Sequence, residues 1–103
     1  MSGADNYSET TRTVASSTTI TGADYNLLVI GATGAVAVTL PSGATIPSGR
    51  VYRVYKDAAA QTITITPAAG TIDGGASTTL ATGAIHAKTF VSDGTNWFTV
   101  AAY

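Results

Sequence analysis

The chain has 103 residues, which is the size of one small domain with a single hydrophobic core. Charged residues make up 11% of the chain and the net charge is −1, so the five Lys and Arg are too few for the basic surface that a nucleic-acid partner requires. There are no cysteines, which excludes disulfides and thiolate metal sites, and no apolar run is long enough for a membrane helix.

The N-terminal segment, residues 1–16, is polar and follows neither the alternation of a strand nor the period of a helix. We expect it to form an arm that becomes ordered only against a partner, with residues 17–103 forming one β-domain. A plain frayed terminus explains the same pattern equally well. The segment lacks the apolar stretch of a signal peptide, so we expect synthesis in the cytoplasm. The charged and aromatic side chains of the arm are Asp5, Tyr7, Glu9 and Arg12.

From Ser17 onward, short β-type segments alternate with turn residues. Val36, Val38 and Leu40 share one face of a segment that alternates as a half-buried strand does. Two prolines and two glycines follow in residues 41–49, which predicts a loop. The strands predicted in this half of the chain are residues 17–21, 27–30 and 35–40.

The second half contains further predicted strands, and the pattern of one of them is ambiguous. Residues 50–56 alternate so that both faces of the strand are expected to be partly covered. Ile63 and Ile65 are expected to point inward, with threonines between them pointing outward. The strands predicted here are residues 50–56, 61–66 and 77–81. In the first of them, Val51, Arg53 and Tyr55 share one face, and Tyr52, Val54 and Lys56 share the other.

The C-terminal stretch predicts a β-hairpin. Two runs rich in β-branched and aromatic residues, 85–91 and 95–100, flank an Asp-Gly pair, which is typical of a tight hairpin turn. Trp97 and Phe98 are neighbours in a strand and therefore point to opposite faces, so we expect one in the core and the other at a sheet or subunit contact. Tyr55 is the third aromatic residue expected in the core or at an interface.

These elements predict an all-β fold: a compact antiparallel β-sandwich or barrel, jelly-roll-like, of about seven or eight short strands with an extended N-terminal arm. The uncharged segment 61–66 has high β-propensity and would promote aggregation at an open sheet edge. Strand lysines and prolines that protect such edges are nearly absent. We therefore expect the edges to be paired in a closed barrel or covered by neighbouring subunits.

The sequence offers few candidates for chemistry. Residues 27–37 begin like a dinucleotide-binding strand, but Ala37 takes the place of the third glycine and no βαβ unit follows. His86 is the single histidine and has no acidic neighbour in the sequence. A calcium site at Asp73 or Asp93 would lack the alternating Asp/Asn spacing of a calcium loop. We expect no catalytic residues, no metal and no cofactor.

Five short motifs follow one another between Val38 and Val100. They are Thr39-Leu40-Pro41, Lys56-Asp57, Thr62 to Pro67, Ile72-Asp73-Gly74 and Ser92 to Trp97. In this order they resemble a small β-domain in the virion proteins of tailed bacteriophages, and the resemblance covers about two-thirds of the chain. Such domains occur in capsid-decorating, head-fibre and tail-fibre proteins, usually as homotrimers.

The resemblance implies a structural protein of the virion, not an enzyme. We expect a trimeric decoration (cement) protein whose arm binds the major capsid protein on the outer head surface. The short arm and the lack of a fibrous shaft favour the head over a tail fibre. The alternative is the receptor-binding tip of a tail fibre, in which tyrosines and Trp97 would stack on a host glycan. We expect neither nucleic acid nor membrane as a partner.

Overall fold

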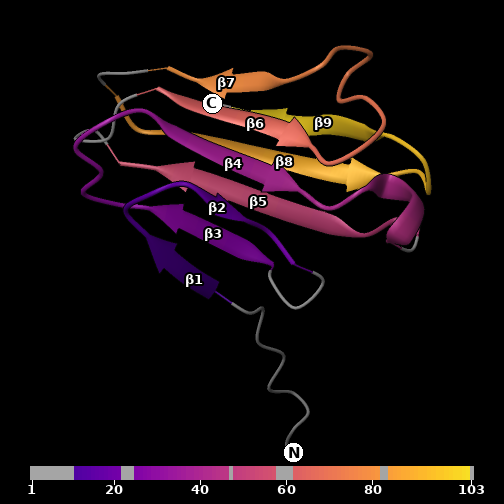
Figure 1. Cartoon of the computed structure of the whole chain (residues 1–103), viewed down its shortest axis with the longest axis horizontal. Coiled ribbons are helices and arrows are strands. Elements are labelled where there is room, and N and C mark those ends of the chain that lie inside the picture. Colours follow the sequence, from indigo (N-terminus) through magenta and orange to yellow (C-terminus); the bar gives the residue numbers. More distant parts are fainter. Residues whose placement is uncertain (1–10, 22–24, 47, 58–61, 82–83, 103) are drawn as a thin grey trace, which may run out of the picture.

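Two β-sheets pack face to face around one core (Figure 1). The computed structural model describes residues 11–21, 25–46, 48–57, 62–81 and 84–102. The five-stranded sheet has the order β1 (Thr11–Val14), β3 (Asn26–Val29), β5 (Val51–Lys56), β8 (His86–Ser92) and β9 (Trp97–Ala102). The four-stranded sheet has the order β2 (Thr18–Thr19), β4 (Val36–Leu40), β6 (Ile63–Pro67) and β7 (Thr78–Leu80).

The predicted all-β class and the sandwich-like layers are confirmed, and the barrel is not formed. Each sheet ends at two different strands, so neither sheet closes on itself. A short 3-10 helix, η1 (Gly43–Thr45), lies in the loop that the prolines and glycines predict, and the described residues contain no α-helix. The described residues form nine strands, where the sequence predicts about seven or eight.

The prediction of an antiparallel fold is wrong for much of the structure. The pairs β1–β3, β3–β5, β2–β4 and β4–β6 are parallel, and antiparallel pairing is confined to β5–β8, β6–β7 and β8–β9. From β1 to β6 the chain alternates between the sheets, so each strand returns to its own sheet in the same direction. A short turn can join two paired antiparallel strands, or it can lead from one sheet into the facing sheet. The turn residues are the same in both cases, so the sequence did not show which pairing occurs.

The core lies between the sheets and follows the predicted alternation. Val36, Val38 and Leu40 are buried, and so are Ile63 and Ile65. A strand with one buried face repeats its apolar residues every second position, which is why these positions could be read from the sequence. The other buried apolar residues are Ile20, Leu27, Val29, Ala32, Tyr52, Val54, Ile72, Leu80, Phe90 and Trp97.

The end of the predicted arm belongs to the five-stranded sheet, since β1 pairs in parallel register with β3. The Arg12 guanidinium donates hydrogen bonds to Thr18 Oγ1 at 3.0 Å and to the Thr19 carbonyl oxygen at 3.1 Å. Arg12 therefore links the first strands of the two sheets and is not part of a free arm. The other predicted arm residues, Asp5, Tyr7 and Glu9, lie outside the described residues.

Two lysines also connect elements of the fold. Lys88 Nζ of β8 donates a hydrogen bond to Thr78 Oγ1 of β7 at 2.6 Å and so joins the two sheets. Lys56 is fully buried, and its Nζ donates to the carbonyl oxygens of Asp57 at 2.9 Å and Ala84 at 2.6 Å. These acceptors offset part of the cost of removing an ammonium group from water.

The predicted hairpin is confirmed, and its turn is shaped by Asp93. The Asp93 carboxylate accepts hydrogen bonds from the backbone N–H groups of Asn96 at 2.7 Å and Thr95 at 2.9 Å. These hydrogen bonds lower the pKa of Asp93, because they favour its charged form. Gly94 has a φ of 95°, which glycine adopts without strain.

Trp97, directly after this turn, contacts both sheets. Its Nε1 donates a hydrogen bond to the Pro41 carbonyl oxygen at 2.9 Å, and its backbone N–H donates to the Thr71 carbonyl oxygen at 2.9 Å. The ring is fully buried, with its centroid 5.4 Å from that of Tyr52. The Thr71 backbone N–H in turn donates to Asn96 Oδ1 at 2.9 Å. Trp97 therefore fixes the hairpin against the loops that follow β4 and β6.

The close packing of these loops on the turn requires glycine at two positions. A Cβ atom at Gly43 would lie 2.5 Å from the Thr95 carbonyl oxygen. A Cβ atom at Gly70 would lie 2.8 Å from Asn96 Oδ1, and Gly70 has a φ of 82°. No side chain fits at either position without moving the backbone of the hairpin turn.

We predict that Trp97→Ala lowers the free energy of unfolding by about 3 to 5 kcal/mol, because it removes the largest buried side chain and leaves a cavity. Phe98→Ala should cost clearly less, because the Phe98 side chain is 40% exposed. Urea unfolding of both variants measures the difference. Equal losses would contradict this assignment of Trp97 to the core.

Gly43→Ala should destabilise the protein by about 1 to 3 kcal/mol, because the added methyl group meets a backbone carbonyl that cannot move alone. Gly34→Ala is the matched control, since a Cβ atom at Gly34 has no neighbour within 4 Å. Thermal unfolding of the two variants tests the prediction. A Gly43→Ala protein as stable as Gly34→Ala would show that the loop does not press on the turn.

Candidate interaction face

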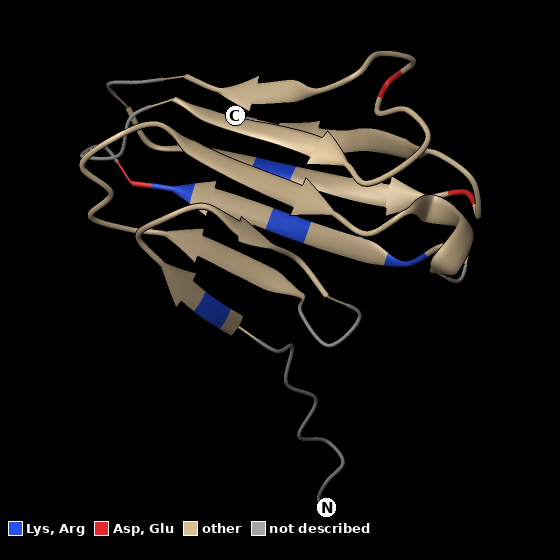
Figure 2. Cartoon of the chain, viewed as in Figure 1, with Lys and Arg blue, Asp and Glu red and all other residues tan. Residues whose placement is uncertain are grey.

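The outer faces of the two sheets differ in chemistry. The strands of the four-stranded sheet carry no charged residue (Figure 2). Its outward side chains are short, and most have a hydroxyl group that water can solvate. They are Thr19, Ala37, Thr39, Thr64, Thr66 and Thr79. The outward side of the five-stranded sheet, called the outer face below, is larger and more apolar.

The pairing register arranges the outer face in three rows that cross the strands. An apolar row joins Val51, Val91 and Phe98. A polar row joins Thr11, Asn26, Arg53 and Thr89. A third row joins Thr13, Leu28, Tyr55 and Ala87. The polar row therefore runs between an apolar row and a row that is apolar except for Thr13.

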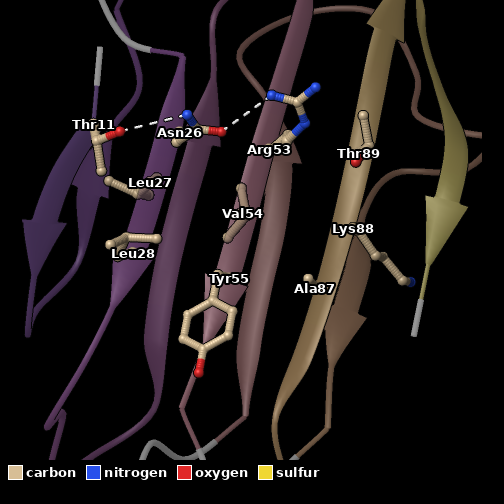
Figure 3. Close-up of a pocket in the computed structure, with 10 residues that line it drawn as sticks. All are labelled: Thr11, Asn26, Leu27, Leu28, Arg53, Val54, Tyr55, Ala87, Lys88 and Thr89. Atoms are coloured by element: carbon tan, nitrogen blue, oxygen red, sulfur yellow. Dashed lines mark hydrogen bonds between the residues drawn. The ribbon is translucent and has the colours of Figure 1, made fainter. Parts of the chain in front are cut away.

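Three of the four side chains of the polar row hydrogen-bond to one another (Figure 3). Asn26 Nδ2 donates to Thr11 Oγ1 at 3.4 Å, and an Arg53 guanidinium nitrogen donates to Asn26 Oδ1 at 3.4 Å. The Arg53 guanidinium also lies 5.3 Å from the centroid of the Tyr25 ring. These contacts link the side chains of β1, β3 and β5 across the face.

A hollow of about 370 Å³ lies over β1, β3, β5 and β8. Leu28 and Tyr55 contribute its largest apolar side chains, and Ala87 lies opposite Tyr55 on β8 (Figure 3). Arg53 and Thr89 of the polar row also line it. Tyr55, which the sequence predicts to be a core or interface residue, is half-buried in this hollow.

At the β9 side of the outer face, two large apolar side chains are exposed. Phe98 is 40% exposed, and Val100 is 59% exposed. Trp97 is fully buried, so the prediction that these neighbours point to opposite faces is confirmed, with Trp97 in the core. A subunit contact for Phe98 stays a prediction.

The start of the β9 edge is covered by the turn that contains Asp73. The Asp73 backbone N–H donates to the Trp97 carbonyl oxygen at 2.9 Å. The Asp73 carboxylate accepts hydrogen bonds from the Thr99 N–H at 2.7 Å and from the Thr99 hydroxyl at 2.6 Å. Burial raises the pKa of Asp73, but these hydrogen bonds and the charge of Lys88 outweigh burial and bring the pKa below its ordinary value of 3.8.

The sequence indicated only part of this face. It placed Val51, Arg53 and Tyr55 together, because alternation within one strand can be read directly. It missed Leu28 and Ala87, because their position beside Tyr55 depends on pairing between distant strands. No local pattern in the sequence carries that register.

Other candidate chemistry is not brought together by the fold. In the part of the chain that the structure describes, no group of three His, Asp or Glu side chains is placed to hold a metal ion. His86 lies opposite Lys56 in the β5–β8 pair. No helix among the same residues is long and apolar enough to cross a membrane. No protein family and no curated protein matches the chain.

The lowered pKa of Asp73 predicts an acid-dependent contribution to stability. The contribution is present above the ordinary pKa of 3.8 and is lost as the pH falls through the lower pKa of the folded state. The stability difference between the wild type and Asp73→Asn should therefore stay constant above about pH 5 and shrink toward about pH 2. Asparagine tolerates the φ of 53° at this position.

Urea unfolding at a series of pH values measures this difference. Thr99→Ala is the companion variant, because loss of the hydroxyl donor should return the pKa of Asp73 toward its ordinary value and weaken the same pH dependence. Parallel pH curves for the wild type and Asp73→Asn would contradict the assignment.

Proposed function

We propose that this chain is a structural protein of a bacteriophage virion that forms a homotrimer and decorates the outer surface of the head. The observation that carries the proposal is the outer face, where a hollow and two exposed apolar side chains lie on one sheet. Exposed apolar patches of this kind mark contacts with other proteins. A protein that works by assembly needs such a face.

The five motifs that resemble phage virion domains also support the proposal, because four of them have clear structural tasks. Pro41 accepts the hydrogen bond from Trp97, and Lys56 is the buried lysine. The Asp57 carboxylate accepts a hydrogen bond from the Gly31 N–H at 3.0 Å. Asp73 forms the turn at β9, and the Ser92 to Trp97 motif is the hairpin turn. The resemblance is therefore carried by residues that fix loops, as expected of a shared fold.

Decoration would stabilise the head by mass action. A protein that binds only the assembled shell stabilises it by RT ln(1 + [L]/Kd), about 2.7 kcal/mol per site at one hundred times Kd. Three arms on one trimer would act as linked ligands, which raises the overall avidity by roughly 10² to 10⁴ over a single arm. In this proposal Asp5, Tyr7 and Glu9 contact the major capsid protein.

The second candidate is the receptor-binding tip of a tail fibre. One feature of the hollow supports this candidate: the aromatic ring of Tyr55 and the polar side chains of Asn26 and Arg53 line it together. An aromatic ring beside polar side chains can stack on a sugar while the polar groups hydrogen-bond to it. The two candidates differ in location on the virion. Immunogold labelling of the head surface supports decoration, and labelling confined to a fibre tip supports glycan recognition.

Deletion of residues 2–9 should abolish co-sedimentation with undecorated capsids while leaving a folded trimer. The deletion must end before Thr11, because Thr11–Val14 pairs with β3 and Arg12 bonds to the other sheet. Sedimentation with purified capsids and light scattering measure the two properties. Truncated protein that still binds capsids fully would rule out the arm and make the loop at residues 41–49 the first alternative.

A further inference from the structure

The outer face has exposed apolar side chains and a hollow on different strands. Phe98 and Val100 are the exposed large apolar side chains of β9, at the end of the sheet, and are called the protrusion below. The hollow lies across β3, β5 and β8, in the row of Leu28, Tyr55 and Ala87. Both are apolar, but they lie in different rows of the face: Phe98 lies in the row of Val51 and Val91.

We infer that the hollow is occupied by a second copy of this chain, with Phe98 and Val100 of one copy seated against Leu28 and Tyr55 of the next. This inference rests on the proposed homotrimer and names the surface that forms it. When the protrusion of each copy enters the hollow of the next, the contact is heterologous, and a rotation that closes after three copies gives a ring.

The charge on the face argues against a two-fold contact. Arg53 lines the hollow, so a reciprocal two-fold contact, which contains both hollows, would contain both copies of Arg53. None of the described outward side chains of this face is acidic. Two buried like charges are costly. In a ring, each contact contains one hollow and therefore one Arg53.

The chemistry of the hollow fits a protein side chain. Thr11, Asn26 and Arg53 of its polar row hydrogen-bond to one another, and Arg53 is additionally placed beside the Tyr25 ring. The surface left for a partner is provided mainly by Leu28, Tyr55 and Ala87. An apolar side chain such as Phe98 can pack against these three side chains.

Two variants test the two halves of the contact separately. Phe98→Lys removes the protrusion and adds a charge, and Ala87→Arg fills the hollow. The matched controls place the same charges on the outer face of the other sheet, as Thr66→Lys and Ala37→Arg, where both side chains are exposed. Light scattering gives the mass of each protein. The wild type and both controls should be trimers, and the two interface variants should be monomers.

Mixing the two interface variants provides the decisive measurement. Ala87→Arg keeps its protrusion and Phe98→Lys keeps its hollow, so an equimolar mixture contains one intact contact per pair. The other contact would place the lysine of the Phe98→Lys variant against the arginine of the Ala87→Arg variant, and these two positive charges repel each other. We therefore expect heterodimers by native mass spectrometry. Monomers in the mixture would overturn the fit of protrusion into hollow.

The remaining outcomes separate this inference from the proposed function. A trimeric wild type whose interface variants are also trimers would place the interface elsewhere and leave decoration of the head open. A monomeric wild type would overturn both the inference and the trimer. Fluorescence of the buried Trp97 reports whether each variant is folded. If Phe98→Lys does not fold, Val100→Lys replaces it, because Val100 is more exposed.

Discussion

The anchoring of Trp97 between the two sheets is the interaction on which the rest of the structure depends. Its indole N–H reaches the carbonyl oxygen of Pro41 after β4, and its backbone bonds to Thr71 after β6. The buried ring stabilises the fold through its large apolar area, and the hydrogen bonds of the residue fix its orientation. The strands from β1 to β6 pair in parallel within their sheets, and β8 and β9 pair antiparallel as a hairpin. Trp97 therefore fixes this hairpin to loops of the opposite sheet.

This anchoring also sets the character of the outer face. Neighbours in a strand point to opposite sides, so the burial of Trp97 requires Phe98 to point outward. The turn at Asp73 then covers the start of the β9 edge, while Phe98 and Val100 stay accessible beside it. Packing of the core and exposure of the proposed contact thus have one cause.

The cations of the chain serve the fold more than the surface. Arg12 and Lys88 each hydrogen-bond to a threonine of the facing sheet, and Lys56 is buried with carbonyl oxygens around it. Because these charges are used internally, the faces left to partners are weakly charged (Figure 2). Such surfaces suit contacts made by shape and apolar area better than contacts made by charge.

The sequence by itself determined the all-β class, most strand positions, the hairpin turn and the inward residues of β4 and β6, because period-two alternation and Asp-Gly chemistry are local. The tertiary structure alone decided that the first six strands wind in parallel, that Thr11–Val14 belongs to the sheet, and that Leu28, Tyr55 and Ala87 share a hollow. These features depend on pairing between strands far apart in the chain. Short turns permit either sheet as the next destination, and only the packing of both sheets around one core selects between them.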